Sequence, residues 1–164
     1  DKLDEFQTVE FNDQTVEVKQ YLPIAEKAEL ISRVLNNSVD DDAGYYNNLK
    51  LDMWLALEIV YAYSNISFTE KQKSDPMKLY DLLSSNKLLN LIIGLVPESE
   101  FYYLTKVTHE LATAIYTYRN SALGILDSIG RDYSNLNFDA TEIQKKLADP
   151  ENLTLLKNIV EKLG

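Results

Sequence analysis

The stretch that decides the fold, residues 98–129, reads ESEFYYLTKVTHELATAIYTYRNSALGILDSI. Its mostly apolar positions recur every seven residues along two lines, as they do where one helix packs lengthwise on another. The first line is Leu104, Leu111, Tyr118 and Ile125, and the second is Thr108, Ile115, Ala122 and Ile129. The pattern predicts one long helix over 98–129. Its stripe is interpreted either as a seam inside a helical bundle or as an interface between subunits.

Proline marks the start of the other predicted helices, because its missing N–H costs nothing in the first turn. All four prolines of the chain stand at such starts: Pro23, Pro76, Pro97 and Pro150. Asp139 and Glu142 resemble a capping box, which opens a further helix. Together with the apolar periodicity, these signals predict helices at 24–37, 47–64, 75–94, 98–129, 139–148 and 150–162. The segments 39–44 and 65–74 are predicted to be loops.

The first twenty residues follow a different period. Residues 8–11 and 14–18 alternate polar and apolar side chains, as strands do. Asn12 and Asp13 suit a two-residue turn, which would set Val9 opposite Val16. Because an isolated hairpin is marginal in water, this one either packs on the helices or accepts a partner's strand at its open edge. We expect the partner role, since the rest of the chain offers no other sheet.

The sequence therefore predicts an all-α protein, a helical bundle of about six helices with a short N-terminal β-hairpin. A chain of 164 residues is long enough to bury a substantial core, and no internal repeat or long linker divides it. We expect residues 1–22 to form the hairpin segment, packed on the body or extending from it, and residues 23–164 to form the helical bundle.

Residue types that carry chemistry are scarce. The chain has no cysteine and one histidine, His109, which excludes thiolate nucleophiles, disulfides and zinc sites built on histidine pairs. Thr105 and Thr113 lie one turn from His109, so we expect a surface or interface histidine and not a catalytic base. Residues 40–44, DDDAG, have glycine at the fifth position, whereas an EF-hand loop needs glycine at the sixth. The segment therefore does not match an EF-hand. We therefore expect no enzymatic activity, no cofactor and no metal.

The negative net charge of the chain limits the kinds of partner that it is expected to bind. A formal net charge of −10 disfavours direct binding of nucleic acid, which needs basic residues against the phosphates, and of an anionic membrane surface. The longest apolar stretch, residues 88–96, is interrupted by Asn90 and is too short to span a bilayer. The first five residues, DKLDE, do not resemble the basic and then apolar start of a signal peptide.

The eleven tyrosines of the chain are the remaining unusual feature. Several pairs are spaced so that their members point to different sides of a helix, which leaves some partly exposed. Tyrosine is a favoured contact residue, because it buries a large area and keeps a polar tip. Packing at the edge of the core explains the tyrosines equally well. The residues that we expect to contact a partner are Val9, Phe11, Val16, Val18, Tyr102 and Tyr116.

Several stretches together resemble a known family: VEVKQYLP at 16–23, NISFTEKQK at 65–73 with KLYDLL at 78–83, and NSALGIL at 120–126. They resemble small helical proteins that tailed phages of low-GC Gram-positive bacteria encode in their virion-morphogenesis genes, in the head–tail region. The resemblance spans most of the chain and brings no catalytic residues.

The resemblance implies a non-enzymatic phage protein that binds other proteins in head or tail assembly, as a virion structural protein or an assembly factor. Its partners would be other phage structural proteins, with a homo-oligomer as a further option, and its location the virion or the host cytoplasm. The alternative is an intracellular phage inhibitor of a host nuclease or defence protein, with an acidic surface that occupies a basic cleft. The acidic residues are interleaved with lysines, which weighs against this alternative.

Overall fold

The computed structural model describes residues 2–40, 45–46 and 48–120. This part is mostly helical with an N-terminal hairpin of two antiparallel strands, so the predicted fold class is confirmed. Its helices are α1 (Ile24–Ser38), α2 (Asn48–Tyr63), α3 (Glu70–Lys73), α4 (Pro76–Ser85), α5 (Leu88–Leu95) and α6 (Glu98–Asn120). The helices predicted at 139–148 and 150–162, and the end of the one predicted at 98–129, lie outside the described residues.

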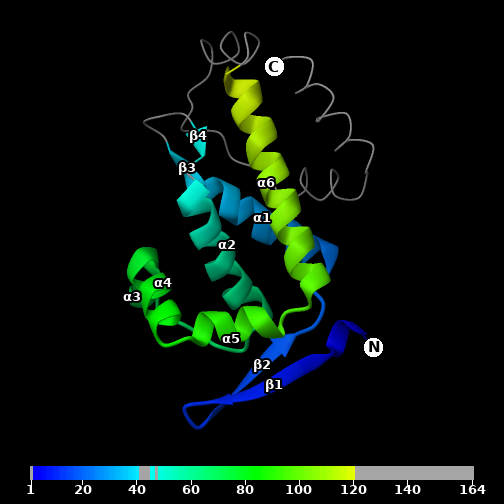
Figure 1. Ribbon diagram of the computed structural model, residues 1–164, viewed down its shortest axis with the longest axis vertical. Helices are drawn as coiled ribbons and strands as arrows, with labels where there is room; N and C mark the ends of the chain where they lie inside the picture. Colours follow the sequence, from blue (N-terminus) through cyan, green and yellow to red (C-terminus); the bar gives the residue numbers. More distant parts are fainter. Residues whose placement is uncertain (1, 41–44, 47, 121–164) are drawn as a thin grey trace.

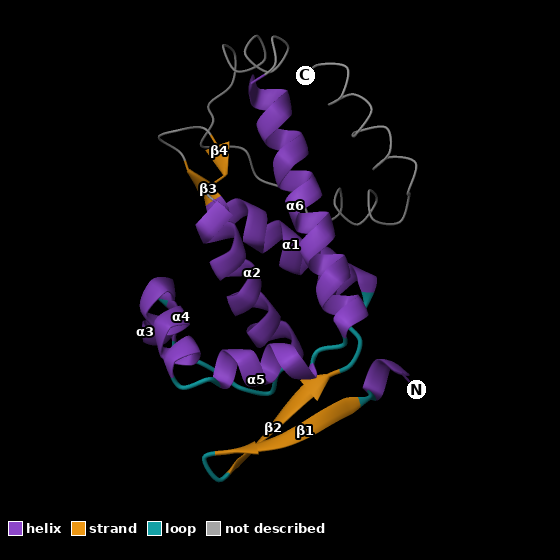
Figure 2. Ribbon diagram, viewed as in Figure 1, coloured by secondary structure: helices purple, strands orange, loops and turns teal. Residues whose placement is uncertain are grey.

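The helices are arranged around α2. The α1–α2 pair is the most extensive helix contact, α6 packs along α1, and α4 and α5 contact α2 near its C-terminal half. Figure 2 shows the N-terminal hairpin at one end of the molecule, beneath α5. A second, unpredicted pair of two-residue strands, β3 (Val39–Asp40) and β4 (Tyr45–Tyr46), lies at the opposite end, where it joins α1 to α2.

The hairpin forms as its alternation predicts. Strands β1 (Phe6–Phe11) and β2 (Gln14–Lys19) pair antiparallel, with Val9 opposite Val16. Asn12 and Asp13 make the turn with φ angles of 48° and 61°. A two-residue turn with both central residues at positive φ matches the twist of the strands, and Asn and Asp tolerate that conformation better than most residues.

The hairpin packs on the helical body. Val16 and Val18 of β2 are 3% and 0% exposed and belong to the same core as the helices. Val18 also forms an isolated bridge with Ser64, just after α2. Leu22, in the link to α1, is fully buried. Burial of these three side chains supplies the stabilisation that a free hairpin lacks.

Three of the four predicted proline starts are confirmed. Helix α1 begins directly after Pro23, α4 begins at Pro76, and α6 begins directly after Pro97. At α4 the Asp75 carboxylate accepts a hydrogen bond from the N–H of Lys78 at 3.2 Å, so a cap precedes the first-turn proline. The fourth proline lies outside the described residues.

The single helix predicted at 75–94 is wrong. It is interrupted after Ser85, because Lys87 adopts a left-handed conformation with φ of 66°. The side chain of Asn86 accepts a hydrogen bond from the N–H of Leu88 at 3.0 Å and so supports the new helix start. Two short helices, α4 and α5, therefore replace one long one and turn the chain back across α2.

The loop predicted at 65–74 contains a helical turn, α3. A reciprocal capping box forms it: Thr69 Oγ1 accepts from the N–H of Gln72 at 3.2 Å, and Gln72 Oε1 accepts from the N–H of Thr69 at 2.8 Å. The T-x-x-Q spacing is a signal of a helix start, and the sequence-based prediction overlooked it.

The stripe on α6 is only partly as predicted. Leu104, Thr108 and Leu111 are buried, and Ile115 packs against the core, so this part is a seam inside the domain. Tyr118 is wrongly placed in the seam, because its side chain is 41% exposed. A strict seven-residue spacing drifts by about 20° per heptad around a straight helix, so the second repeat has turned away from the core.

The α6 seam gives a test of the packing. Leu111→Ala should lower the free energy of unfolding by about 2–5 kcal/mol, because a buried side chain is truncated and a cavity is left. Ile115→Ala should cost less, since Ile115 is only half-buried. Thr113→Ala, on the exposed side of the same helix, is the control and should stay within about 0.5 kcal/mol. Urea denaturation of the three variants measures this order, and equal losses would contradict it.

Candidate functional site

Two opposite charges are buried together between α1 and α6. The Lys27 Nζ lies 2.6 Å from Glu100 Oε2, and the two side chains are 8% and 6% exposed. Lys27 sits in the first turn of α1 and Glu100 in the first turn of α6. Charged side chains are rarely buried this deeply unless they are paired, so each residue explains the burial of the other.

Three tyrosines complete the cluster around this pair. The ammonium of Lys27 lies 4.3 Å from the ring centroid of Tyr21 and 5.4 Å from that of Tyr103. The negative faces of aromatic rings attract a cation at such distances. The hydroxyl of Tyr63, at the end of α2, donates a hydrogen bond to Glu100 Oε2 at 3.1 Å. We call these residues the Lys27 cluster: Tyr21, Lys27, Tyr63, Glu100 and Tyr103.

The surroundings raise the pKa of two tyrosines of the cluster, Tyr63 and Tyr103, and so keep them protonated. Burial is the main cause that raises the pKa of Tyr63 far above its usual value, and the negative charge of Glu100 and the hydrogen bond to it add to the shift. The pKa of Tyr103 is raised by burial, by Tyr21 and by Glu100. A phenol that stays neutral can donate a hydrogen bond to the carboxylate throughout the neutral range.

Lysine, glutamate and tyrosine are residue types that enzymes use, but this arrangement favours a structural role. The charged atoms of Lys27 and Glu100 satisfy each other, and both side chains are closed off from solvent. What the cluster does in the fold is to join four segments: the β2–α1 link, α1, the end of α2 and the start of α6.

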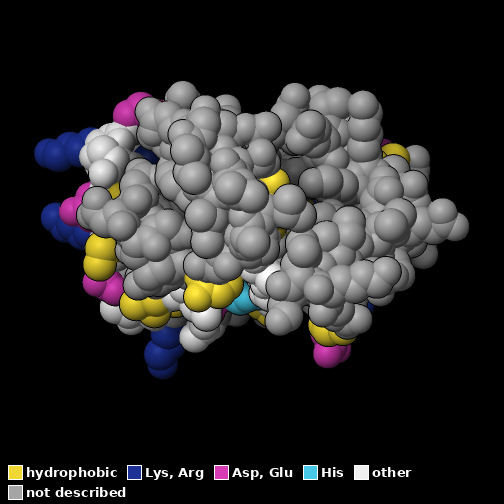
Figure 3. All heavy atoms as spheres, turned by 90° about the horizontal axis from the view of Figure 1, so that it is seen from above, with side chains coloured by type: hydrophobic (Ala, Val, Ile, Leu, Met, Phe, Trp, Pro, Cys, Tyr) yellow, Lys and Arg dark blue, Asp and Glu magenta, His cyan; other side chains and the backbone are white. Residues whose placement is uncertain are grey.

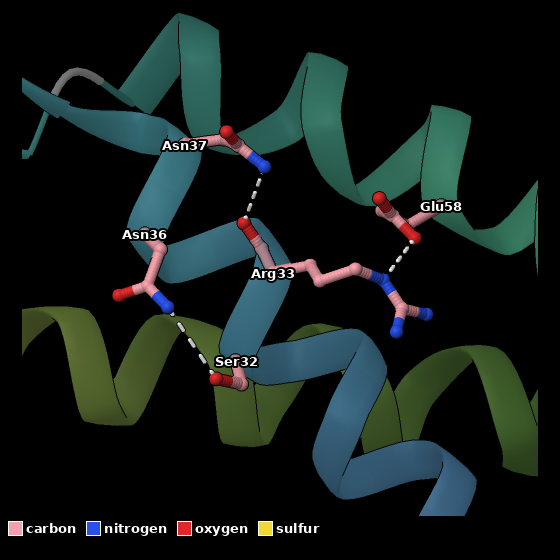
Figure 4. A network of polar contacts seen from close by, with 5 residues as sticks. All are labelled: Ser32, Arg33, Asn36, Asn37 and Glu58. Atoms are coloured by element: carbon pink, nitrogen blue, oxygen red, sulfur yellow. Dashed lines mark hydrogen bonds and ion pairs between the residues drawn. The ribbon is translucent and has the colours of Figure 1, made fainter. Parts of the chain in front are cut away.

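A second ion pair links the interior of α1 to the interior of α2. Arg33 Nε on α1 donates to Glu58 Oε2 on α2 at 2.9 Å (Figure 4). The Glu58 side chain is 7% exposed and that of Arg33 is 48% exposed, so this pair lies at the boundary of the core. Burial and the charge of Glu58 also raise the pKa of the neighbouring Tyr61.

The polar residues of α1 around Arg33 brace this part of the helix. The amide of Asn37 donates to the backbone carbonyl of Arg33 at 2.8 Å, and Asn36 Nδ2 lies 3.5 Å from Ser32 Oγ one turn back (Figure 4). Each of these contacts joins residues four positions apart, which lie on the same face of the helix one turn from each other.

The histidine is a surface residue with one polar partner. His109 Nε2 on α6 lies 3.0 Å from Asp52 Oδ1 on α2, and the two side chains are 38% and 66% exposed. The sequence showed only its helical neighbours Thr105 and Thr113. Asp52 stands 57 residues away in the chain, so nothing local could indicate the pair.

The described part of the chain holds no group of three or more His, Asp or Glu side chains placed to bind a metal. Of the acidic segment 40–44, only the backbone of residue 40 falls within it. The expectation that 40–44 binds no metal therefore stays a prediction. In that same part of the chain, no helix is long and apolar enough to cross a membrane.

The six residues predicted to contact a partner fall into three groups. Val16 and Val18 are buried in the core, so the expectation that they contact a partner is corrected. Val9 and Phe11 are half-buried against the core. Tyr102 and Tyr116 are 64% and 47% exposed on α6. The latter two stand fourteen residues apart, roughly 21 Å along the helix, so the structure does not gather the six into one patch.

Comparison of the chain with protein-family models, with curated proteins and with solved structures gave no match.

The Lys27 cluster predicts how its charges respond to substitution. Glu100→Gln should destabilise the protein by about 3–5 kcal/mol, because Lys27 is left buried without a counter-charge. Combining it with Lys27→Met removes both charges and should recover a large part of that loss. Asp52→Asn, in the exposed pair with His109, is the control and should stay within about 0.5 kcal/mol. Thermal and urea unfolding of these three variants and of the Lys27→Met single variant give the comparison, and a double variant as unstable as the sum of its singles would contradict the prediction.

The raised pKa of Tyr63 predicts a loss of stability in alkali. In the unfolded chain a tyrosine loses its proton near pH 10, whereas the folded protein keeps Tyr63 protonated. Above about pH 10 the unfolded state therefore binds fewer protons, and stability falls as pH rises. Tyr63→Phe should make this fall shallower, by up to about 1.4 kcal/mol per pH unit. Urea unfolding from pH 8 to pH 11 measures the slope. Tyr102→Phe, on the exposed face of α6, is the matched control and should leave it unchanged.

Proposed function

We propose that this chain is a non-enzymatic phage protein that binds other proteins during head or tail assembly. Two independent lines support the proposal. The stretches at 16–23, 65–73 with 78–83, and 120–126 resemble morphogenesis proteins of tailed phages. The second line is the distribution of exposed apolar side chains at the hairpin end of the molecule.

That apolar set is the observation that carries the proposal. Leu3 and Phe6 are each 49% exposed, Tyr21 is 39% exposed and Ile24 is 37% exposed. All four lie within four residues of one backbone pairing, in which the N–H of Gln20 donates to the carbonyl of Glu5 at 3.0 Å. Large apolar side chains that gather at one place on a surface mark a site of protein contact. The end of the molecule that carries the hairpin is therefore the favoured contact surface.

The Lys27 cluster supports a binding role and not a catalytic one. Its lysine and glutamate are buried and paired with each other, and Tyr63 and Tyr21 contact them, so the cluster acts as a rigid connection between the hairpin link and three helices. A rigid body with a projecting hairpin (Figure 2) presents a contact surface at little entropic cost on binding.

The alternative, inhibition of a host nuclease or defence protein through an acidic surface, has weaker support. Figure 3 looks onto the end of the molecule that lies away from the hairpin. The described charged side chains that are visible there lie at the margin of the view and include both acidic and basic groups. A surface that imitates nucleic acid needs a continuous run of negative charge.

An in-frame deletion in the encoding phage tests the proposal. Phage DNA should accumulate normally after induction, whereas electron microscopy should show incomplete heads or tails, because an assembly contact is missing. The intact gene supplied from a plasmid should restore complete particles. Mass spectrometry of purified complete and incomplete particles then reports whether the chain stays in the virion. Normal particles in normal number would contradict the proposal. Loss of phage DNA in a nuclease-positive host alone would favour the inhibitor alternative.

A further inference from the structure

The outer edge of β1 is open. In an antiparallel pair, residues alternate between those whose backbone groups face the partner strand and those whose groups face away. The N–H of Gln20 donates to the carbonyl of Glu5, which fixes the phase of this alternation. The backbone groups of Gln7, Val9 and Phe11 therefore face β2. Those of Phe6, Thr8 and Glu10 face outward.

The other edge of the hairpin is occupied at Thr15 and Glu17, and the bonds there confirm this alternation. The N–H of Glu17 donates to Asn65 Oδ1 at 3.0 Å, and the carbonyl of Glu17 accepts from the N–H of Asn65 at 3.1 Å. Asn65 Nδ2 donates to the carbonyl of Thr15 at 3.2 Å. Thr15 and Glu17 are the residues of β2 that the alternation turns away from β1. Asn65 thus occupies that edge with both its backbone and its side-chain amide.

No described residue does the same for β1. The N–H groups of Phe6, Thr8 and Glu10 have no hydrogen-bond partner in the described part of the chain, and all three side chains are exposed. Proteins usually protect an edge strand with proline, lysine or a bulge. The sequence of β1, FQTVEF, contains neither proline nor lysine, and its register with β2 is unbroken over six pairs.

The two faces of the hairpin define what an added strand would meet. Val9 and Phe11 lie on the face that packs toward the core. Glu10 lies on the opposite, solvent-facing side, as does Glu17, which is paired with Thr8. A residue added opposite Val9 would extend the apolar face. A residue added opposite Glu10 would lie next to a carboxylate, where lysine or arginine is favoured.

We propose that the outer edge of β1 binds an extended segment of a partner protein, added as an antiparallel strand, in which basic residues alternate with apolar ones. That a protein partner exists rests on the proposed function. The present proposal adds which kinds of residue the bound segment of that partner contains. Main-chain hydrogen bonds to Phe6, Thr8 and Glu10 provide the attachment, and the alternation provides the selectivity. A second copy of this chain is disfavoured, because its hairpin would bring the same acidic side chains to the contact.

Synthetic peptides test the geometry with the full-length chain. The probe is a fluorescein-labelled heptapeptide of alternating lysine and valine, and fluorescence anisotropy measures its binding. In the proposed antiparallel pairing, residues directly opposite Thr8 and Glu10 turn their amides toward β1, and these are the lysines. N-methylation of the lysine amides should weaken binding at least tenfold, whereas N-methylation of the valine amides should change it less than threefold. Equal effects of the two modifications would overturn the proposal.

Variants of the protein test the charge and the edge separately. Glu10→Lys should weaken binding of the lysine–valine peptide at least fivefold. Glu29→Lys makes the same change of net charge at an exposed position of α1 and should have little effect. Thr8→Pro removes one outward N–H and should weaken binding, whereas Thr8→Ala keeps it and should bind as wild type. Circular dichroism checks that each variant is folded. If Thr8→Pro is not folded, the comparison of Glu10→Lys with Glu29→Lys decides. Equal binding of the peptide by these two variants would overturn the proposal.

Self-association is measured on the same proteins by analytical ultracentrifugation. A monomer that binds the peptide supports the proposal. A dimer that Thr8→Pro separates and Thr8→Ala does not would assign the edge to a second copy and overturn it. These measurements need no phage, so their failure leaves the particle experiment standing, and failure of the particle experiment leaves the peptide result standing.

Discussion

The buried contact between Lys27 and Glu100 is the constraint on which the arrangement of the described elements depends. Removing two charges from water costs several kcal/mol per ion, and only close pairing with further hydrogen bonds offsets this cost. The 2.6 Å separation and the hydrogen bond from Tyr63 meet that requirement. Any packing that slid α6 along α1 by one turn would leave both charges buried and unpaired. The pair therefore selects one register among several that apolar side chains alone would permit.

The tyrosines show how one residue type serves both the interior and the surface. Tyr63 is fully buried and its hydroxyl donates to Glu100, whereas Tyr21 and Tyr103 offer their ring faces to the Lys27 ammonium. Tyr61 packs edge-on against Phe68, with ring centroids 5.6 Å apart, and lies 5.2 Å beneath the Lys73 ammonium. Tyr102 instead projects into solvent from α6. Core packing and surface exposure, which the sequence left as equal interpretations, both occur.

Local signals predicted the local structure well. The alternation around the Asn12–Asp13 turn and the prolines before α1, α4 and α6 act within a few residues, so sequence spacing captures them. The break at Lys87 was missed because a lysine at positive φ has no propensity signal, and only its surroundings impose that conformation. The candidate site was not predictable from spacing at all. Lys27 and Glu100 are brought together by the fold across most of the described chain, and neither is unusual in its own helix.

Asn65 has a consequence for stoichiometry. Asn65 bonds to the outer edge of β2 at Thr15 and Glu17 with its backbone and its side chain, and so leaves β1 as the more open edge of the small sheet. A sheet with two open edges can add a further strand at each edge without limit and so form fibres. A sheet with a single open edge accepts one added strand and then stops. Asn65 thus limits the hairpin to binding one added strand, so that the site can be saturated and does not promote aggregation. At the high protein concentration of a cell, this difference separates a complex of defined stoichiometry from an aggregate.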